Sequence, residues 1–142
     1  AVLFPDLVIA LYDGRWAVVV CRTTAGMASA EGKSVWDSVQ TYAKRYGLGY
    51  LMTDGSLSTA DLARMPLPEG FTSALSDAVR EAGRLEHTEV ESIMARFGAT
   101  RQQMLSVVWR NTMTYRPTPG WIDWAGPPST GPSEASSSLC IP

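Results

Sequence analysis

Residues 18 to 37, VVVCRTTAGMASAEGKSVWD, join an apolar run to a small-residue loop, and Gly32-Lys33-Ser34 then precedes a predicted helix. A phosphate-binding loop requires Gly-x-x-x-x-Gly-Lys-Ser/Thr at such a place, because its backbone amides and its lysine hold the phosphates. Met27 occupies the position of the first glycine here, and Gly26 comes one residue early. The segment predicts phosphate or nucleotide binding through Gly32, Lys33 and Ser34. The alternative, a connector with a helix cap, stays open.

A second pattern with chemical meaning begins at Asp6. This residue precedes two apolar runs, and later in the chain a predicted helix leads to a strand that runs into Asp54-Gly55. The order resembles the PD-(D/E)XK nuclease family, which includes restriction endonucleases, over residues 4 to 56. The resemblance implies that Asp6, an acidic residue in the next strand and a lysine two positions later bind magnesium and activate water.

The chain departs from that family at two of the three positions. Cys21 and Thr23 stand where the acid and the lysine are expected, and neither replaces a carboxylate on magnesium. Glu31 and Lys33 follow the strand, and family members in which such residues have moved to the next helix show how they would compensate. We therefore expect Asp6, Glu31 and Lys33 to be the catalytic set, with Mg²⁺ as cofactor, if the centre is active. Otherwise the fold remains without the chemistry.

A third pattern lies in residues 89 to 111, EVESIMARFGATRQQMLSVVWRN. A helix, a glycine-containing turn and a second capped helix resemble a helix-turn-helix, whose second helix enters the major groove of DNA. Four arginines and no acidic residue occur from Arg96 to Arg116. We predict that nucleic acid contacts Arg96, Arg101, Gln102 and Arg110. An ordinary helical hairpin that buries its apolar residues is the alternative.

The elements that must position these residues follow from hydrophobic periodicity. Asp13-Gly14 between apolar runs at 7–12 and 16–21 predicts a β-hairpin. A helix at 34–46, with Ser34 and Asp37 as a capping box, and a strand at 50–53 predict a crossover with parallel pairing. The continuous hydrophobicity of the strands predicts helices on both faces of the sheet. Further helices are predicted at 58–65, 71–82, 88–97 and 100–112. Three of them begin with predicted caps, formed by Ser58 with Asp61, Thr88 with Glu91, and Thr100 with Gln103.

The fold class is therefore α/β (α+β), with a small mixed sheet, an N-terminal hairpin, a crossover helix and a helical C-terminal half. We divide the chain into a nuclease-like core at 1–56, a helical portion at 57–116 and an extended tail at 117–142. The tail is rich in Pro, Gly and Ser, a composition typical of disorder. We expect a partner chain or a larger assembly to hold it.

Composition limits the function classes. The 142 residues carry a net charge of −2, so nucleic-acid binding would need a local basic patch. His87 is the only histidine and the two cysteines lack metal-ligand spacing, so we assign no metal site. No apolar run is long enough to span a membrane, and we expect an intracellular protein.

The predicted function is nucleic-acid association by a nuclease-like scaffold with an inactive centre, inside a larger protein; whether the chain is an enzyme stays open. The first alternative is a nucleotide-binding NTPase cofactor of a viral RNA polymerase, with a viral particle as its location. It is based on a slight resemblance to the NTPase cofactors of reovirus-type double-stranded RNA viruses. The second alternative is a structural assembly domain.

Overall fold

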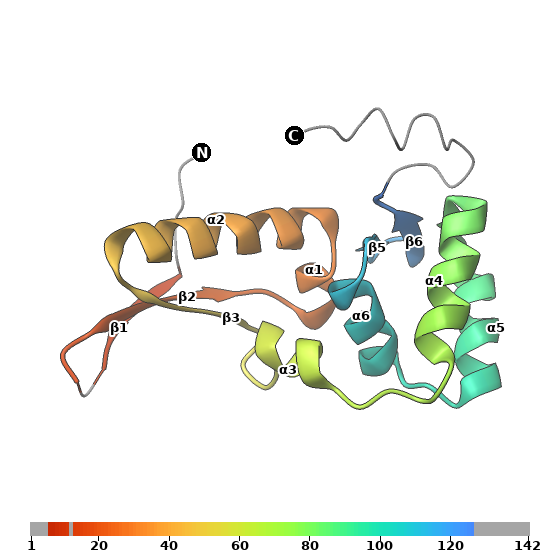
Figure 1. Ribbon diagram of the computed structural model, residues 1–142, viewed down its shortest axis with the longest axis horizontal. Helices are drawn as coiled ribbons and strands as arrows, with labels where there is room; N and C mark the ends of the chain where they lie inside the picture. The colour runs from red at the N-terminus through yellow and green to blue at the C-terminus, as the bar shows by residue number, and fades with distance from the viewer. Residues whose placement is uncertain (1–5, 12, 127–142) are drawn as a thin grey trace.

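The computed structural model describes residues 6–11 and 13–126 of the chain, which form a small mixed α+β domain with two three-stranded sheets (Figure 1). In chain order the elements are β1 (Leu7–Ala10), β2 (Trp16–Cys21), α1 (Thr24–Met27), α2 (Ala30–Tyr46), β3 (Gly49–Thr53), α3 (Thr59–Arg64), α4 (Phe71–Ala82), β4 (Arg84–Leu85), α5 (His87–Phe97), α6 (Arg101–Arg110), β5 (Met113–Arg116) and β6 (Trp121–Trp124).

The first sheet has the strand order β1-β2-β3. β1 and β2 are antiparallel and are joined by the turn at Asp13-Gly14, where Gly14 has a φ of 85°. β3 is parallel to β2, because α2 carries the chain back along the sheet before β3 begins. The predicted hairpin, crossover helix and parallel strand are therefore confirmed.

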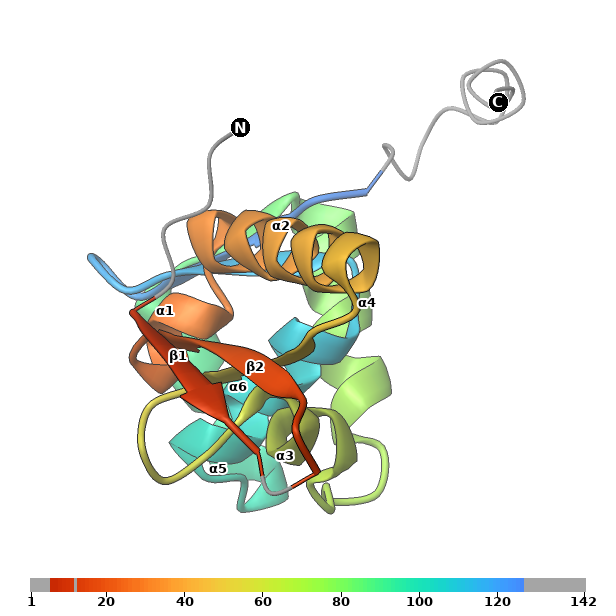
Figure 2. The ribbon, with the colours of Figure 1, turned by 90° about the vertical axis from the view of Figure 1, so that its left-hand side faces the viewer.

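One face of this sheet packs against helices, and the other face is partly exposed at its edge strands. Val18, Val20 and Met52 point to the same side and share a core with residues of α2 and α3. On the opposite side, Ile9 is 42% exposed and Leu51 is 38% exposed. The central strand β2 is buried on both faces, as its apolar run predicted, but the edge strands are partly exposed on this side. The expected coverage of both faces is therefore incomplete. The hairpin lies at the end of the molecule away from α4 and α5, and Figure 2 shows it with α2 above it.

The second half contains the predicted helices and one sheet that was not predicted. Capping boxes begin α3 at Ser58 and Asp61 and α6 at Thr100 and Gln103, as predicted. The box predicted at Thr88 and Glu91 is wrong, because α5 begins earlier, with Glu86 and Glu89 as its capping box. The short strands β4 and β5 flank β6 in an antiparallel sheet of order β4-β6-β5. Residues 71 to 124 thus fold as helix, strand, helix, helix and β-hairpin.

The position of β6 corrects the predicted tail. Trp121–Trp124 is the central strand of the second sheet, and Ile122 is fully buried in the core beneath it. The Pro- and Ser-rich composition of the whole segment concealed a short strand of β-forming residues. Within residues 117 to 126, β6 is therefore held by β4 and β5 of the same chain. The rest of the predicted tail, residues 127 to 142, lies outside the described residues.

The start of α2 also differs from the prediction. The helix begins at Ala30 with Ser29 as its N-cap, and a single helical turn, α1, precedes it. Ser34 therefore lies inside the helix, and the expected capping box with Asp37 is wrong. Small residues suggested a loop here, but they allow α1 and α2 to approach closely. A Cβ atom on Gly32 would lie 2.6 Å from the carbonyl oxygen of Met27.

Two apolar cores lie on either side of α1 and α6. The first contains residues of β2, α2, β3 and α3, and the second is formed mainly by α4, α5, α6 and the second sheet. From α1 and its C-cap, Met27 enters the first core while Ala25 and Ala28 enter the second. Trp109 of α6 packs against the first core, although Leu105 and Val108 belong to the second. The two halves are thus packed together rather than linked by a free connector.

We predict that Gly32→Ala lowers the free energy of unfolding by about 3 kcal/mol or more, because the added methyl group overpacks against the backbone of α1. Gly47→Ala in the same helix is the matched control. Gly47 ends α2 at a φ of 68° with no atom near the added Cβ, so only backbone strain of about 1–2 kcal/mol is expected. Urea denaturation of both variants checks this, and equal losses would contradict the proposed close packing.

Candidate functional site

Asp6 connects the beginning of the first strand to the end of the second. Its Oδ2 atom accepts a hydrogen bond of 2.7 Å from the backbone N–H of Cys21 and lies 3.5 Å from Nη1 of Arg22. Arg22 also donates to the carbonyl oxygen of Cys21 over 2.8 Å. The aspartate expected to bind magnesium is therefore held by a backbone amide and a guanidinium.

The positions expected to carry the acid and the lysine hold an exposed thiol and a helix-capping hydroxyl. Thr23 is the N-cap of α1, and its Oγ1 atom accepts a hydrogen bond of 2.9 Å from the N–H of Gly26. Cys21 is an exposed, free cysteine at the end of β2. Neither residue supplies the carboxylate or the ammonium group that the nuclease mechanism requires.

Asp54 closes the same edge of the first sheet, where β2 and β3 end side by side. Its Oδ1 atom accepts from the N–H groups of Ser56 and Leu57, and its Oδ2 atom accepts from the hydroxyl of Thr24 over 2.5 Å. The hydrogen bond from Leu57, followed by those from Thr24 and Ser56, lowers the pKa of Asp54. This carboxylate is therefore committed to the turn that follows β3.

Lys33 spans the boundary between the two halves. Its ammonium group donates to the carbonyl oxygens of Val108, Asn111 and Met113 over 2.7, 2.8 and 2.5 Å. These oxygens lie at the C-terminal end of α6 and just beyond it, where the last carbonyl groups of a helix lack intrahelical donors. The oxygen of Val108 also accepts from the N–H of Asn111, over 3.4 Å. All three N–H donors of Lys33 are therefore directed at protein oxygens.

The other two residues of the predicted phosphate-binding triplet are also placed. Gly32 is buried in the first turn of α2, and its N–H donates to Oγ of Ser29 over 3.0 Å. Ser34 is exposed one turn into the helix. The backbone amides of this segment are thus part of a capped helix rather than an open loop.

Asp6, Glu31 and Lys33 are directed to three different places. Asp6 binds the end of β2, Lys33 binds the end of α6, and Glu31 lines a cavity beside the second sheet. Within residues 6–11 and 13–126, no three side chains of His, Cys, Asp or Glu are grouped so that they could hold a metal ion.

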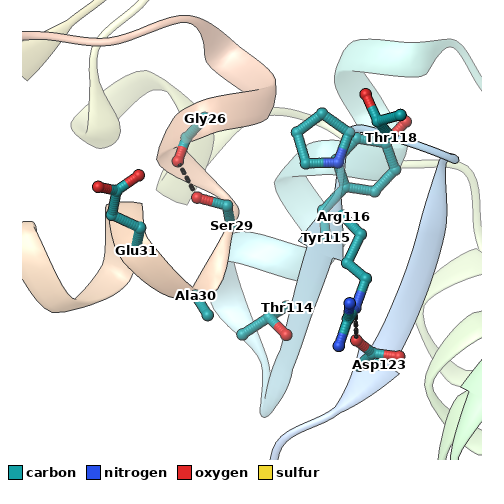
Figure 3. A pocket seen from close by; sticks show the side chains of 10 residues that line it. Gly26, Ser29, Ala30, Glu31, Thr114, Tyr115, Arg116, Thr118 and Asp123 are labelled. Atoms are coloured by element: carbon teal, nitrogen blue, oxygen red, sulfur yellow. Dashed lines mark hydrogen bonds and ion pairs between the residues drawn. The ribbon is translucent and has the colours of Figure 1, made fainter.

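The cavity that contains Glu31 has a volume of ≈ 460 Å³ and lies between the α1–α2 junction and the β5–β6 hairpin (Figure 3). Ser29, Ala30 and Glu31 line it on one side, and Thr114, Arg116 and Asp123 line it on the other. The N–H of Tyr115 donates to the carbonyl oxygen of Ala28 over 3.0 Å and joins the two walls.

Asp123 beside this cavity holds two arginines. Its Oδ1 atom is 2.6 Å from Nε of Arg84 on β4, and its Oδ2 atom is 2.6 Å from Nε of Arg116 on β5. Partial burial raises the pKa of Asp123, but the hydrogen bonds from Arg116 and Arg84 outweigh that effect and leave the pKa below its usual value. The guanidinium of Arg84 also lies over the indole ring of Trp121, 4.4 Å from its centre.

Sequence reasoning missed Arg84, Trp121 and Asp123 because it missed their strands. Alternation was the available signal: in WIDW, Ile122 points to the core while Trp121 and Asp123 point outward.

The helix-turn-helix residues divide into exposed and structural ones. Gly98, with a φ of 65°, ends α5 as predicted, but Met104 to Val108 of α6 are all buried. Arg110 donates to the carbonyl oxygens of Leu62 and Met65, so it fixes the end of α3 against α6. Among the other predicted contacts, Arg96 lies over Phe97, Arg101 lies over Tyr115, and Gln102 is exposed.

Comparison with known proteins gives no match to a family model, to a curated protein or to a solved structure. In the part of the chain that the structure describes, no helix combines the length and the apolar character needed to cross a membrane.

We predict that Lys33→Met destabilises the fold by about 2–3 kcal/mol, because three carbonyl oxygens at the end of α6 and just beyond it lose their hydrogen-bond donor. Lys44→Met is the control, since Lys44 is exposed on the same helix and its replacement should change stability by less than about 0.5 kcal/mol. Thermal and urea unfolding measure both. Equal stability of the two variants would exclude the capping role.

The stability difference between wild type and Lys33→Met should also depend on pH. Burial lowers the pKa of Lys33 from its ordinary 10.5 to about 8. Between these values the unfolded chain keeps the proton that the folded chain has released, so stability from this residue rises with pH. Other groups titrate in both proteins and cancel in the difference. Urea denaturation from pH 7 to pH 10 should show a widening gap, and a constant or narrowing gap would contradict the lowered pKa.

Proposed function

We propose that this chain is a nucleic-acid-associated module, built on a nuclease-like scaffold whose centre does not cleave, within a larger protein. The observation that carries this proposal is that three side chains at the expected catalytic positions make contacts within the fold. Asp6 binds a backbone amide, Thr23 caps α1 and Lys33 caps α6. Because these side chains hold the fold together, they are not available to bind magnesium and activate water.

The order of helices and strands in the first half supports the nuclease-like part of the proposal. A hairpin, a crossover helix and a parallel strand follow Asp6, as the resemblance implied. The expected compensation by Glu31 and Lys33 has no support in the contacts of those residues. A degenerate centre explains both the retained order and the replaced side chains.

The helical half supports association with nucleic acid through its exposed arginines. However, α6 cannot lie in a major groove, because its central residues are buried and its last arginine binds the end of α3. We therefore propose binding through phosphate contacts at exposed arginines rather than base reading by α6.

The exposed apolar residues support membership in a larger assembly. The large hydrophobic side chains that are exposed in the described residues all belong to the first half: Val8, Ile9, Leu11, Trp16, Tyr42, Tyr46 and Leu51. Such a concentration on one end of a domain is typical of a contact surface. Nucleotide binding is the weaker candidate, because Lys33 would first have to leave three carbonyl oxygens.

Nuclease and binding assays test this proposal together. We expect no cleavage of DNA or RNA with Mg²⁺ or Mn²⁺, and Asp6→Ala should only destabilise the fold by about 1–2 kcal/mol, since the N–H of Cys21 loses its acceptor. We also expect binding to an oligonucleotide that weakens as salt increases. Metal-dependent cleavage that disappears in Asp6→Ala would refute the inactive centre, and absence of any oligonucleotide binding would refute the association.

A further inference from the structure

We propose that the outer face of the second sheet binds single-stranded nucleic acid, with a phosphodiester on Arg84 and Arg116 and an unpaired base on the Arg84–Trp121 stack. This inference rests on the proposed association with nucleic acid and assigns it to a surface. None of its three central residues was among those predicted from the sequence.

Asp123 orients the two guanidinium groups of this surface. Arg84 and Arg116 each use Nε to reach one oxygen of the same carboxylate, over 2.6 Å in both cases. Their remaining guanidinium nitrogens make no hydrogen bond to the described residues. Two arginines against one aspartate leave a net positive charge, and planar guanidinium groups in a fixed orientation suit the bidentate recognition of phosphate oxygens.

The same group of residues offers a flat stacking surface. The guanidinium of Arg84 is 4.4 Å from the centre of the Trp121 ring, and the register of β6 with β4 and β5 places Arg84, Arg116 and Trp121 on the outer face. Unpaired bases stack on aromatic rings and on guanidinium planes, whereas bases inside a duplex do not offer their faces. This feature favours a single strand.

The position of α6 excludes the usual duplex alternative. A helix-turn-helix reads a duplex by inserting its second helix into the major groove, but residues 104 to 108 of α6 are buried in the domain core. Arg84, Arg116 and Trp121 lie on the sheet instead, next to a cavity of ≈ 460 Å³ that Arg116 also lines. Besides Asp123, the carboxylate that lines this cavity is Glu31, on the opposite wall. Its negative charge would repel a phosphate, so the phosphate chain would lie on the side of the arginines.

Fluorescence anisotropy with a labelled single-stranded oligonucleotide of about 12 nucleotides tests the inference, in DNA and RNA forms and at several salt concentrations. Arg84→Ala/Arg116→Ala should weaken binding about tenfold or more and flatten the slope of log affinity against log salt by about 0.7, the contribution of the one phosphate that the two arginines bind together. Trp121→Leu should weaken binding about fivefold or more without changing that slope, and Trp121→Phe should restore much of the affinity.

Arg45→Ala/Arg80→Ala is the matched control, because it removes the same charge from two exposed arginines on other elements. Arg80 is also paired with an aspartate, Asp77, over 2.7 Å. This control should change affinity less than twofold. Circular dichroism and melting curves show whether each variant is folded.

The outcomes separate this inference from the proposed function. If wild type binds but the sheet variants match the Arg45/Arg80 control, the surface assignment is wrong and the association stands. Preference of wild type for a duplex of the same sequence also overturns the single-strand assignment. If wild type binds no oligonucleotide, both are wrong.

Discussion

The end of α6 needs hydrogen-bond partners, and Lys33 supplies them. The last carbonyl groups of a helix have no backbone donor, and their burial without a partner would cost free energy. One ammonium group satisfies the oxygens of Val108, Asn111 and Met113, and it reaches them from a helix that lies more than seventy residues earlier in the chain. The approach of α2 to α6 is thereby fixed, and the two cores meet at that boundary.

This constraint determines which residues remain free for chemistry. In the phosphate-loop hypothesis Lys33 binds the phosphate, and in the nuclease hypothesis it is the catalytic lysine. In the structure its ammonium group instead donates to carbonyl oxygens at the boundary between the two halves. Arg110 is also used by the fold, because its guanidinium donates to a carbonyl oxygen of α3 and does not extend toward a ligand. Burial also works against a charge at Lys33, and the lowered pKa reflects the desolvation of its ammonium. Lys33 is partly buried and already hydrogen-bonded to three carbonyl oxygens. It therefore stabilises the contact between the two halves and is not free to bind a phosphate.

The sequence predicted well those features that depend on neighbouring residues. Asp13-Gly14 indicated the hairpin, and the capping residues of α3 and α6 act on amides only three positions away. It predicted poorly what depends on distant contacts. The start of α2 depends on its packing against α1, and β6 exists because β4 and β5 flank it. The arrangement of the candidate site residues also depends on distant contacts: Asp6 binds the end of β2, Lys33 binds the end of α6, and Glu31 lines a cavity beside the second sheet.

The location of the positive charge follows from these packing constraints. A chain with a net charge of −2 does not attract nucleic acid as a whole, so any binding must come from arginines that are close together and oriented. Arg110 is occupied, and Arg96 and Arg101 lie over separate aromatic rings. Arg84 and Arg116 differ because the strands of the second sheet bring them to one carboxylate. The strand that sequence composition assigned to a tail is thus the element that gathers the guanidinium groups most suited to an anion.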